Sequence, residues 1–170
     1  TKAYQTGEVS VKALKGISLQ LDKHSFVSFI GPSGSGKSTL LNLIGVLDKP
    51  SQGTIRVNGT DVNTLDRAAA AAFRGKTIGF VFQNFNLIPV LTVYENVEYP
   101  LLMLDRLPSK ERRDRVLRLL EKVGMTDQKE KLPNQISGGQ KQRVAVARAL
   151  VTNPQIVLAD EPTHIIGKYV

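Results

Sequence analysis

A glycine-rich stretch near the N-terminus carries the strongest chemical signal in the sequence. Residues 31–39 read GPSGSGKST, and residues 31–38 match the pattern G-x-x-x-x-G-K-[ST] at every fixed position. Glycines allow successive backbone N–H groups to point into one concavity, and the start of a following helix adds positive potential. Such a loop binds nucleotide phosphates, and the bland alternative is a Gly/Ser-rich loop with an incidental lysine. The residues expected to contact the phosphates are Gly31, Ser33, Gly34, Ser35, Gly36, Lys37, Ser38 and Thr39.

Two adjacent carboxylates, Asp160 and Glu161, follow an apolar run that predicts a buried strand over residues 155–159. An acidic residue at the tip of a buried strand is where a phosphate-loop enzyme holds its metal. We therefore expect Asp160 to bind Mg²⁺ together with the Ser38 hydroxyl. Glu161 is expected to polarise the attacking water as general base, with Lys37 on the β- and γ-phosphates. A solvated Asp-Glu turn is the alternative.

A third candidate lies at residues 137–140, which read SGGQ and precede a predicted helix over residues 141–151. Ser137 suits a helix N-terminus, where its side chain can accept a hydrogen bond from a free N–H. Gly138 and Gly139 permit a phosphate to approach the backbone closely. A plain capped turn is the alternative for this tetrapeptide alone.

The elements that must position these residues are indicated by hydrophobic periodicity. Residues 26–30 predict a strand that enters the phosphate loop, and residues 37–44 predict the helix that leaves it, with Leu40, Leu41 and Ile44 available for one buried face. The alanine run at 68–72 predicts part of a surface helix, and residues 78–82 predict another strand. Helical spacing of apolar residues predicts a helix at Val116, Leu119, Leu120 and Val123. Breaks are expected at Pro89, Pro100, Pro108 and Pro133.

Composition narrows the classes of function. The formal net charge is +8, but the densest basic stretch, residues 106–122, is interleaved with Glu111, Asp114 and Glu121, which indicates a solvated helix face rather than a nucleic-acid site. Cysteine is absent, which excludes disulfides. The chain has no signal peptide and no apolar run near 18 residues, so any link to a membrane is expected to pass through a partner protein.

The motifs together resemble a known family. The loop at 31–39, ISGGQ at 136–140 and LADEPT at 158–163 occur in the order and spacing of ABC-type ATPase domains. Residues 13–19, 43–50 and 78–87 are similar to the lipoprotein-releasing and macrolide-export branch of ABC transporters. The resemblance covers residues 1 to about 163. It implies an α/β fold: a P-loop NTPase core with a mixed sheet and an inserted helical subdomain, C-terminally truncated here.

The resemblance implies further roles at matching positions. Gln83 resembles the Q-loop glutamine, which contacts Mg²⁺ or water and senses the transmembrane partner; a surface glutamine is the alternative. Tyr4 resembles the aromatic residue that stacks on adenine, although an ordinary strand tyrosine would look the same. Ser137, Gly138, Gly139 and Gln140 resemble the signature that contacts the γ-phosphate bound on the opposite subunit, so that a head-to-tail homodimer encloses two ATP molecules.

The organisation expected from this resemblance has three pieces. Residues 1–90 form the first part of the nucleotide-binding core, residues 91–151 form the helical subdomain ending in the signature helix, and residues 152–170 return to the core with an atypical tail. The family's D-loop aspartate is missing after Asp160, and His164 is too close to Glu161 for the switch-histidine role. The sequence therefore predicts a truncated or altered C-terminus and leaves open whether this form hydrolyses ATP.

The leading hypothesis is an Mg²⁺-dependent ATPase subunit that energises export, or release of a lipoprotein, peptide or drug, through an integral membrane permease, on the cytoplasmic face of the membrane. A soluble ABC-type ATPase acting on nucleic acid or in translation is one alternative, although DNA-repair members carry a long coiled coil that has no room here. A small GTPase or kinase is disfavoured because no Asn-Lys-x-Asp motif is present. A fragment that binds ATP without hydrolysing it is the remaining possibility.

Overall fold

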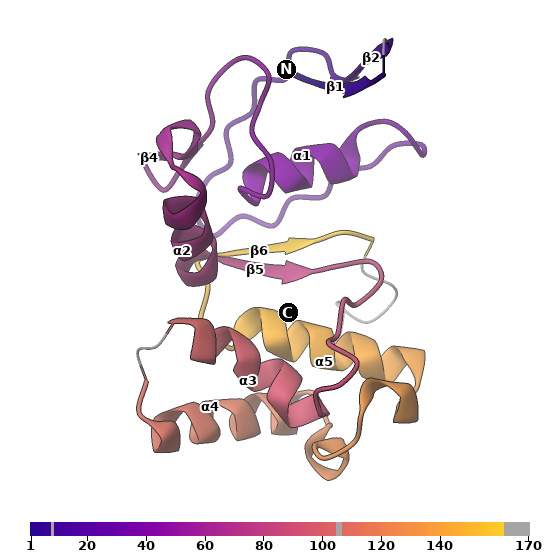
Figure 1. Cartoon of the computed structure of the whole chain (residues 1–170), viewed down its shortest axis with the longest axis vertical. Coiled ribbons are helices and arrows are strands. Elements are labelled where there is room, and N and C mark those ends of the chain that lie inside the picture. Colours follow the sequence, from indigo (N-terminus) through magenta and orange to yellow (C-terminus); the bar gives the residue numbers. More distant parts are fainter. Residues whose placement is uncertain (8, 105–106, 162–170) are drawn as a thin grey trace. The chain divides into compact units, whose positions relative to one another are not determined.

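The computed structural model of the chain describes residues 1–7, 9–104 and 107–161. The chain divides into two compact units, residues 1–70 and residues 71 onward. Both contain helices and strands (Figure 1).

The first unit holds the N-terminal hairpin and the helix that follows the phosphate loop. Its elements are β1 (Lys2–Thr6), β2 (Val9–Leu14), α1 (Lys37–Ile44), β3 (Arg56–Val57), β4 (Thr60–Asp61) and the short 3-10 turn η1 (Val62–Thr64). β1 pairs with β2 and β3 with β4, both antiparallel. Helix α1 confirms the predicted range, and its C-terminal end is closed by the Gly45 N–H, which donates to Leu41 O. Leu43 is the buried residue of α1, while Leu40, Leu41 and Ile44 are half-buried.

The strand predicted at residues 26–30 is wrong: the structure places these residues outside regular secondary structure. Phe26 is 80% exposed and Ile30 is 94% exposed. An apolar run favours an extended backbone, but a strand persists only where a neighbouring chain completes its hydrogen-bond ladder. Within the described residues, no such ladder forms along this run.

Helix α2 (Arg67–Thr77) contains the predicted alanine helix and leads directly into the second unit. The remaining elements are β5 (Ile78–Val81), α3 (Val93–Leu104), α4 (Ser109–Lys122), the short turns η2 (Thr126–Gln128) and η3 (Pro133–Gln135), α5 (Gly138–Leu150) and β6 (Ile156–Ala159). β5 and β6 are parallel and in register from Ile78 opposite Ile156 to Val81 opposite Ala159. The strands predicted at 78–82 and 155–159 are therefore confirmed within one residue at their ends. The burial predicted for the second strand is wrong, since Val157 is 47% exposed; among the described residues β6 pairs with β5 alone.

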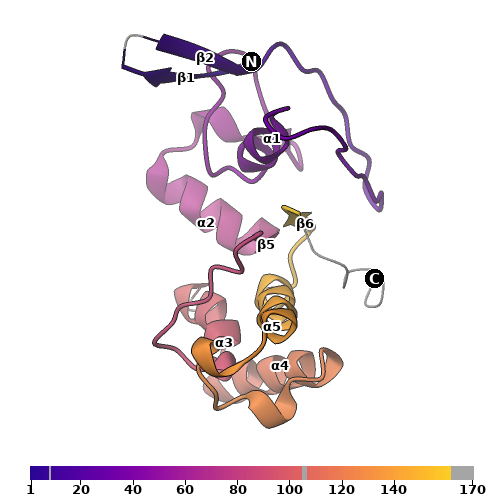
Figure 2. The same cartoon turned by 90° about the vertical axis from the view of Figure 1, so that its right-hand side faces the viewer.

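Helices α3, α4 and α5 surround one apolar core in the second unit (Figure 2). Val93, Val97 and Leu101 line one face of α3, and Val116 and Leu120 supply the matching face of α4. The other buried members are Val123, Met125, Ile136, Val144, Ala147 and Val151. The helical spacing read from the sequence of α4 is thus confirmed.

Pro100 contradicts the predicted break, since α3 continues through it to Leu104. A proline inside a helix costs about 3 kcal/mol because it lacks an N–H and crowds the preceding turn. Burial of Val93, Val97 and Leu101 on the same helix contributes roughly 1.5–3 kcal/mol for each side chain. Packing of the helix face therefore exceeds the local penalty. Pro108 and Pro133 do lie at element starts, as predicted.

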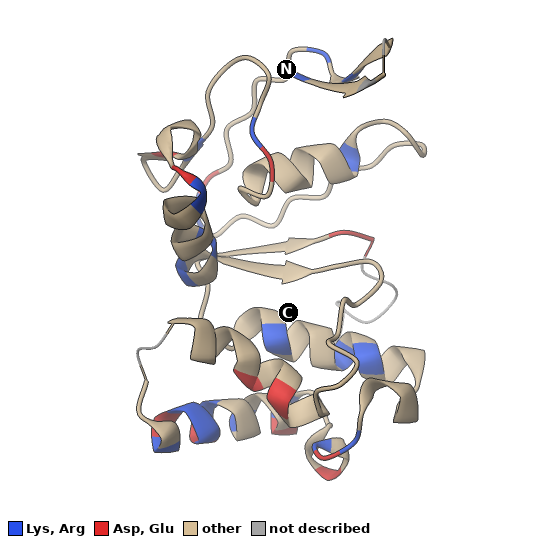
Figure 3. Ribbon diagram, in the orientation of Figure 1, with Lys and Arg blue, Asp and Glu red and all other residues tan. Residues whose placement is uncertain are grey.

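Basic and acidic residues are interleaved along α4, as the sequence indicates (Figure 3). Arg112 Nε donates to Glu98 Oε1 of α3 at 2.8 Å, and Arg115 pairs with Glu111 along α4. Arg113 and Arg118 are exposed. Across the described ranges, no helix is both long and apolar enough to cross a membrane.

Candidate functional site

The phosphate loop closes on itself through its lysine. Lys37 Nζ donates hydrogen bonds to Gly31 O at 2.8 Å and to Pro32 O at 2.9 Å, and Ser35 N–H donates to Pro32 O at 3.3 Å. The ammonium therefore already lies over the loop that the sequence assigned to phosphate. Ser33 and Ser38 are exposed, and Thr39 is half-buried in the first turn of α1.

Two glycines give this loop its curvature. Gly34 and Gly36 have φ angles of 78° and 92°, in the left-handed region that favours glycine. A Cβ on Gly36 would lie 2.8 Å from Ala13 O at the end of β2, so the loop also needs the absence of a side chain there. Gly36 precedes α1 without a side-chain cap, and the first turn of α1 contains no acidic residue. The free N–H groups and helix dipole at this end favour an anion.

Tyr4 lies on β1 opposite Val11 and is held by two polar neighbours. Its hydroxyl donates to Asp48 Oδ2 at 3.0 Å, and Lys2 Nζ, 4.8 Å from the centre of its ring, donates to Asp48 Oδ1 at 2.7 Å. Desolvation alone would raise the pKa of Asp48, but hydrogen bonds from Lys2, the Lys49 N–H and Tyr4 hold that pKa below its usual value. Neither Lys2 nor Asp48 was singled out in the sequence, because no motif links them.

The second unit brings together two polar side chains that lie 78 positions apart in the sequence. Gln83 Nε2 donates to Glu161 Oε2 at 2.7 Å, and the Asp160 N–H donates to Val81 O at 3.0 Å. Because β5 and β6 are parallel, their carboxyl ends meet at the same edge, and the residues after each strand become neighbours. Glu161 has a φ angle of 45°. The acidic pair at the end of β6 is marked in red in Figure 3. Residues 162–170, including His164, lie outside the described residues.

The start of α5 is capped as predicted. Ser137 Oγ accepts from the Gln140 N–H at 3.3 Å, and Gln140 Oε1 accepts from the Ser137 N–H at 2.8 Å. This reciprocal capping box satisfies two of the backbone donors at the helix start. At this helix start, the N–H groups of Gly138 and Gly139 are the ones for which the described residues provide no acceptor. Neither carries a side chain that would obstruct an approaching anion.

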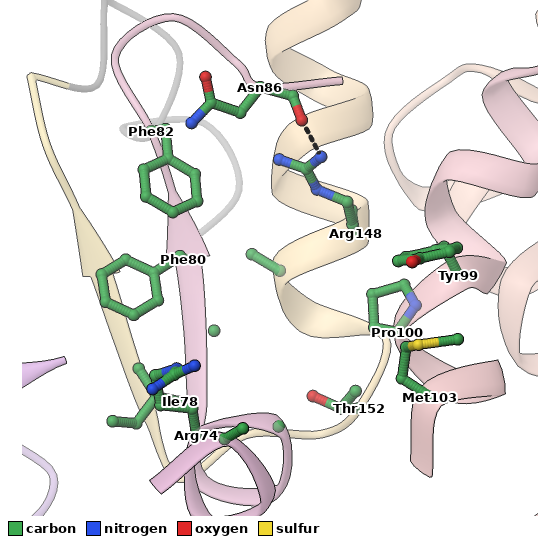
Figure 4. Close-up of a pocket in the computed structure, with 14 residues that line it drawn as sticks. Arg74, Ile78, Phe80, Phe82, Asn86, Tyr99, Pro100, Met103, Arg148 and Thr152 are labelled. Carbon is green, nitrogen blue, oxygen red and sulfur yellow. Dashed lines mark hydrogen bonds between the residues drawn. The ribbon is translucent and has the colours of Figure 1, made fainter. Parts of the chain in front are cut away.

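Arg148, near the other end of α5, is a residue that motif reasoning missed. Its two Nη atoms donate to Phe85 O and Asn86 O in the loop that follows Gln83. Burial lowers the pKa of the Arg148 guanidinium from its usual value. The guanidinium lies beside a largely apolar cavity of about 430 Å³ that is lined by α2, β5, α3 and α5 (Figure 4). A charged residue within the otherwise apolar run Ala147 to Leu150 is the one sequence signal that could have drawn attention to it.

The oxygen groups expected to hold Mg²⁺ are a hydroxyl from Ser38, an amide from Gln83 and a carboxylate from Asp160. Such hard oxygen ligands suit Mg²⁺, which usually keeps several waters and binds few protein groups. Among the residues that the structure covers, no cluster of three or more His, Cys, Asp or Glu side chains suited to a metal occurs. The donor chemistry fits the ion. Ser38 belongs to the first unit, and Gln83 and Asp160 belong to the second.

A glycine loop closed by a lysine, a carboxylate pair after a parallel strand and a capped SGGQ helix define a nucleotide-binding ATPase domain. The family profile described as ABC transporter matches residues 14–164. The chain therefore belongs to the ABC transporter family, as an ATP-binding domain. Members of this family hydrolyse ATP, which they typically bind with Mg²⁺. The family and fold class read from the sequence are confirmed.

Curated relatives match nearly the whole chain. An ABC transporter ATP-binding protein of Thermotoga maritima is 50% identical over 95% of this chain and 69% of its own length. The ABC transporter ATP-binding protein MJ0796 of Methanocaldococcus jannaschii is 51% identical over 96% of this chain and 71% of its own length. The macrolide export ATP-binding/permease protein MacB of Marinobacter nauticus is 48% identical over 96% of this chain and 25% of its own length. The similarity to the export branch is thereby confirmed.

Solved structures agree with the sequence comparison. A dimeric structure of the ATP-binding cassette MJ0796, in a post-hydrolysis state bound to ADP and Pi, has a TM-score of 0.90 and 49% identity. It covers 96% of this chain and 72% of that protein. A second dimeric structure of MJ0796 also has a TM-score of 0.90, with 50% identity over 95% of this chain and 71% of that protein.

Proposed function

We propose that this chain binds and hydrolyses Mg-ATP and transmits the resulting change to a membrane permease. The observation that carries the hydrolytic part is the 2.7 Å hydrogen bond between Gln83 and Glu161. These residues lie 78 positions apart, yet they meet at the carboxyl end of two parallel strands, where a phosphate-loop enzyme places its catalytic groups.

Binding of the triphosphate is assigned to the loop at 31–39. Its backbone N–H groups and the start of α1 attract the phosphates, and Lys37 exchanges its bonds to Gly31 O and Pro32 O for oxygens of the β- and γ-phosphates. The adenine is assigned to Tyr4, whose ring is held in place by Lys2 and Asp48. Affinity then comes from the phosphates and selectivity from the base.

Hydrolysis is assigned to Glu161 as general base. Gln83 donates to Oε2 of this carboxylate, while Oε1 accepts no hydrogen bond from the described residues and is left to orient a water. Ser38, Gln83 and Asp160 would hold Mg²⁺, which neutralises charge on the β- and γ-phosphates when it is bound. The catalytic contribution of the chain is therefore positioning and charge stabilisation.

A second copy of the chain completes each site in this proposal. The N–H groups of Gly138 and Gly139, with Ser137 and Gln140, are assigned to the γ-phosphate held by the opposite copy, in a head-to-tail homodimer. The capped start of α5 supports this assignment, because it leaves the N–H groups of two residues without side chains available at the helix start. The dimers described for MJ0796 support it as well.

The membrane partner is proposed to be a permease, either a separate subunit or a further part of the same polypeptide as in MacB, whose name joins both activities. The ATPase domain would then lie at the cytoplasmic face of the membrane. Residues 1–90 and 152–170 are proposed to act as the core, and residues 91–151 as the helical subdomain that ends in the signature helix.

The test is Mg-ATP-dependent phosphate release by the purified intact protein. We expect Glu161→Gln to lower turnover about 1000-fold, since removing a general base usually costs between about 10² and 10⁴. Glu121→Gln, which removes the same charge from an exposed position on α4, should leave turnover within about twofold. An intact protein that binds ATP but releases no phosphate would contradict the hydrolytic part, and one that does not bind ATP would contradict the whole proposal.

A further inference from the structure

The turn that follows β5 has a conformation that its own residues disfavour. Phe85 and Asn86 have φ angles of 59° and 47°, and neither is a glycine. Two successive left-handed residues are uncommon, because the Cβ of an L-residue crowds the following carbonyl. The turn is closed by the Phe85 N–H, which donates to Phe82 O at 3.0 Å, and by the Asn86 N–H, which donates to Asn84 O at 2.6 Å. Something outside the turn must hold it in this form.

Arg148 supplies that outside contact. The two ends of its guanidinium fork donate to Phe85 O and Asn86 O, the carbonyls of the two left-handed residues. No carboxylate among the described residues pairs with this guanidinium, so the two carbonyl oxygens are the acceptors for its charge-assisted hydrogen bonds. Charge-assisted bonds from a planar fork fix both the distance and the orientation of the acceptors. Figure 4 shows the side chain extending from α5 toward Asn86.

The turn matters because Gln83 immediately precedes it. The Gln83 side chain reaches Glu161 at 2.7 Å, a bond that requires the backbone after Val81 to leave β5 in one defined direction. Asn96 holds the next segment in the same way. Its side chain accepts from the Ile88 N–H and donates to the carbonyls of Ile88 and Leu91. Residues 83–91 are therefore fastened at two points, one of them charged.

Arg148 also belongs to the helix that begins with the SGGQ segment. Ser137 caps α5, and Arg148 lies 11 residues further along, roughly 16 Å at 1.5 Å per residue. Both residues belong to one continuous helix, so a rigid-body displacement of α5 at the Ser137 end would also displace Arg148. The guanidinium fork then carries that displacement to the turn beside Gln83.

We propose that Arg148 is a positioning residue for Gln83, linking α5 to the turn that sets the Gln83–Glu161 contact. This inference rests on the proposed function, because it assigns a step in catalysis to Gln83. It goes beyond that function in naming the residue through which the signature helix would influence turnover.

A double-mutant cycle on the intact protein tests the link. We expect Arg148→Met to lower kcat about tenfold with KM within about twofold, because the phosphate loop is untouched. Arg148→Lys, which keeps the charge but loses the planar fork of donors, should lower kcat about threefold. In a Gln83→Ala background, Arg148→Met should change kcat by less than about twofold, since residues that act through one another are not additive. Effects that multiply would overturn the proposal, as would full turnover in Gln83→Ala.

Hydrogen exchange provides a readout that needs no activity. The amides of Phe85 and Asn86 should exchange about tenfold faster in Arg148→Met, whereas Arg118→Met, an exposed arginine on α4, should leave them unchanged. Unchanged exchange of these two amides in Arg148→Met would overturn the inference that Arg148 holds the turn at Phe85 and Asn86. If the intact protein shows no Mg-ATP turnover, the proposed function fails, and the catalytic part of this inference fails with it. The hydrogen-exchange rates of Phe85 and Asn86 then test only whether Arg148 holds the turn.

Discussion

In the phosphate loop, Lys37 bonds to a carbonyl only six positions earlier in the chain, whereas Gln83 and Glu161 meet across 78 positions. The loop is thus built by local backbone geometry: left-handed glycines, a helix start and one long side chain. The carboxyl end of β5 and β6 depends on two strands being in register and on the turn after β5. A contiguous site depends on a few positions of its own, while a site assembled from distant segments depends on everything that aligns them.

The region at the carboxyl ends of β5 and β6 can be disrupted without changing its polar groups. The largest effect is expected from disturbing the packing of β5. A Cβ on Gly79 would lie 2.2 Å from Ala149 O of α5, a backbone atom that cannot rotate away. We expect Gly79→Ala to lower the free energy of unfolding by about 3 kcal/mol, at the upper end of overpacking costs. Urea unfolding measures this change. Gly138→Ala, which meets no atom within 4 Å, is the control and should cost nothing; an equal loss in both variants would contradict the packing argument.

Substitutions in the phosphate loop and at the carboxyl ends of β5 and β6 should also affect different measured quantities. Lys37→Ala removes the charge-assisted donor of the loop, and we expect it to weaken ATP binding by about 2 kcal/mol, or about 30-fold. Glu161→Gln should leave ATP affinity within about threefold, because the water it orients is not part of the bound nucleotide. Binding of a fluorescent ATP analogue to each variant measures both values. Comparable losses of affinity in the two variants would remove the distinction between a binding region and a chemical one.

The smallest effect is expected at the support of Tyr4. The folded-state pKa of Asp48 is lowered, so its contribution to stability is present above its ordinary pKa of 3.8 and is lost as the pH falls through the lower folded value. Wild-type protein should therefore lose more stability than Asp48→Asn on acidification below pH 3.8, by about 0.5 kcal/mol for a partly exposed ion pair. Urea midpoints measured across this pH range test the difference. Asp114→Asn, at an exposed position on α4, should follow the wild-type curve.

Features of the fold that local patterns determine were predictable, whereas those that need distant partners were predictable only in part: the strands at 78–82 and 155–159 are confirmed within one residue, and the strand at 26–30 is wrong. The helix at 37–44 and the Ser137 cap follow from patterns within one or two turns, and both are confirmed. The strand at 26–30 failed because its ladder partner is not encoded in its own residues. The helix break at Pro100 failed for the same reason, since the burial that outweighs it comes from other helices.

The candidate site divides along the same line. The chemical types at Lys37, Gln83 and Glu161 could be read from motifs, although their assigned roles stay predictions. The contacts that hold these residues could not be read, because Arg148 binds backbone carbonyls 62 and 63 positions away, and such acceptors leave no mark in the sequence. Asp48 is similar, since it meets Lys2 across 46 positions through side chains that any surface could carry.

The self-closed lysine of the phosphate loop has a consequence for selectivity. Two carbonyl oxygens already accept from two of the three donors of the Lys37 ammonium, so an anion that takes more than one of these donors has to displace a carbonyl. A singly charged oxyanion offers the ammonium little more than the carbonyls do, whereas a polyphosphate brings several charged oxygens at once. The loop therefore favours ligands of high negative charge. It selects for a polyphosphate independently of any contact between the nucleotide base and Tyr4.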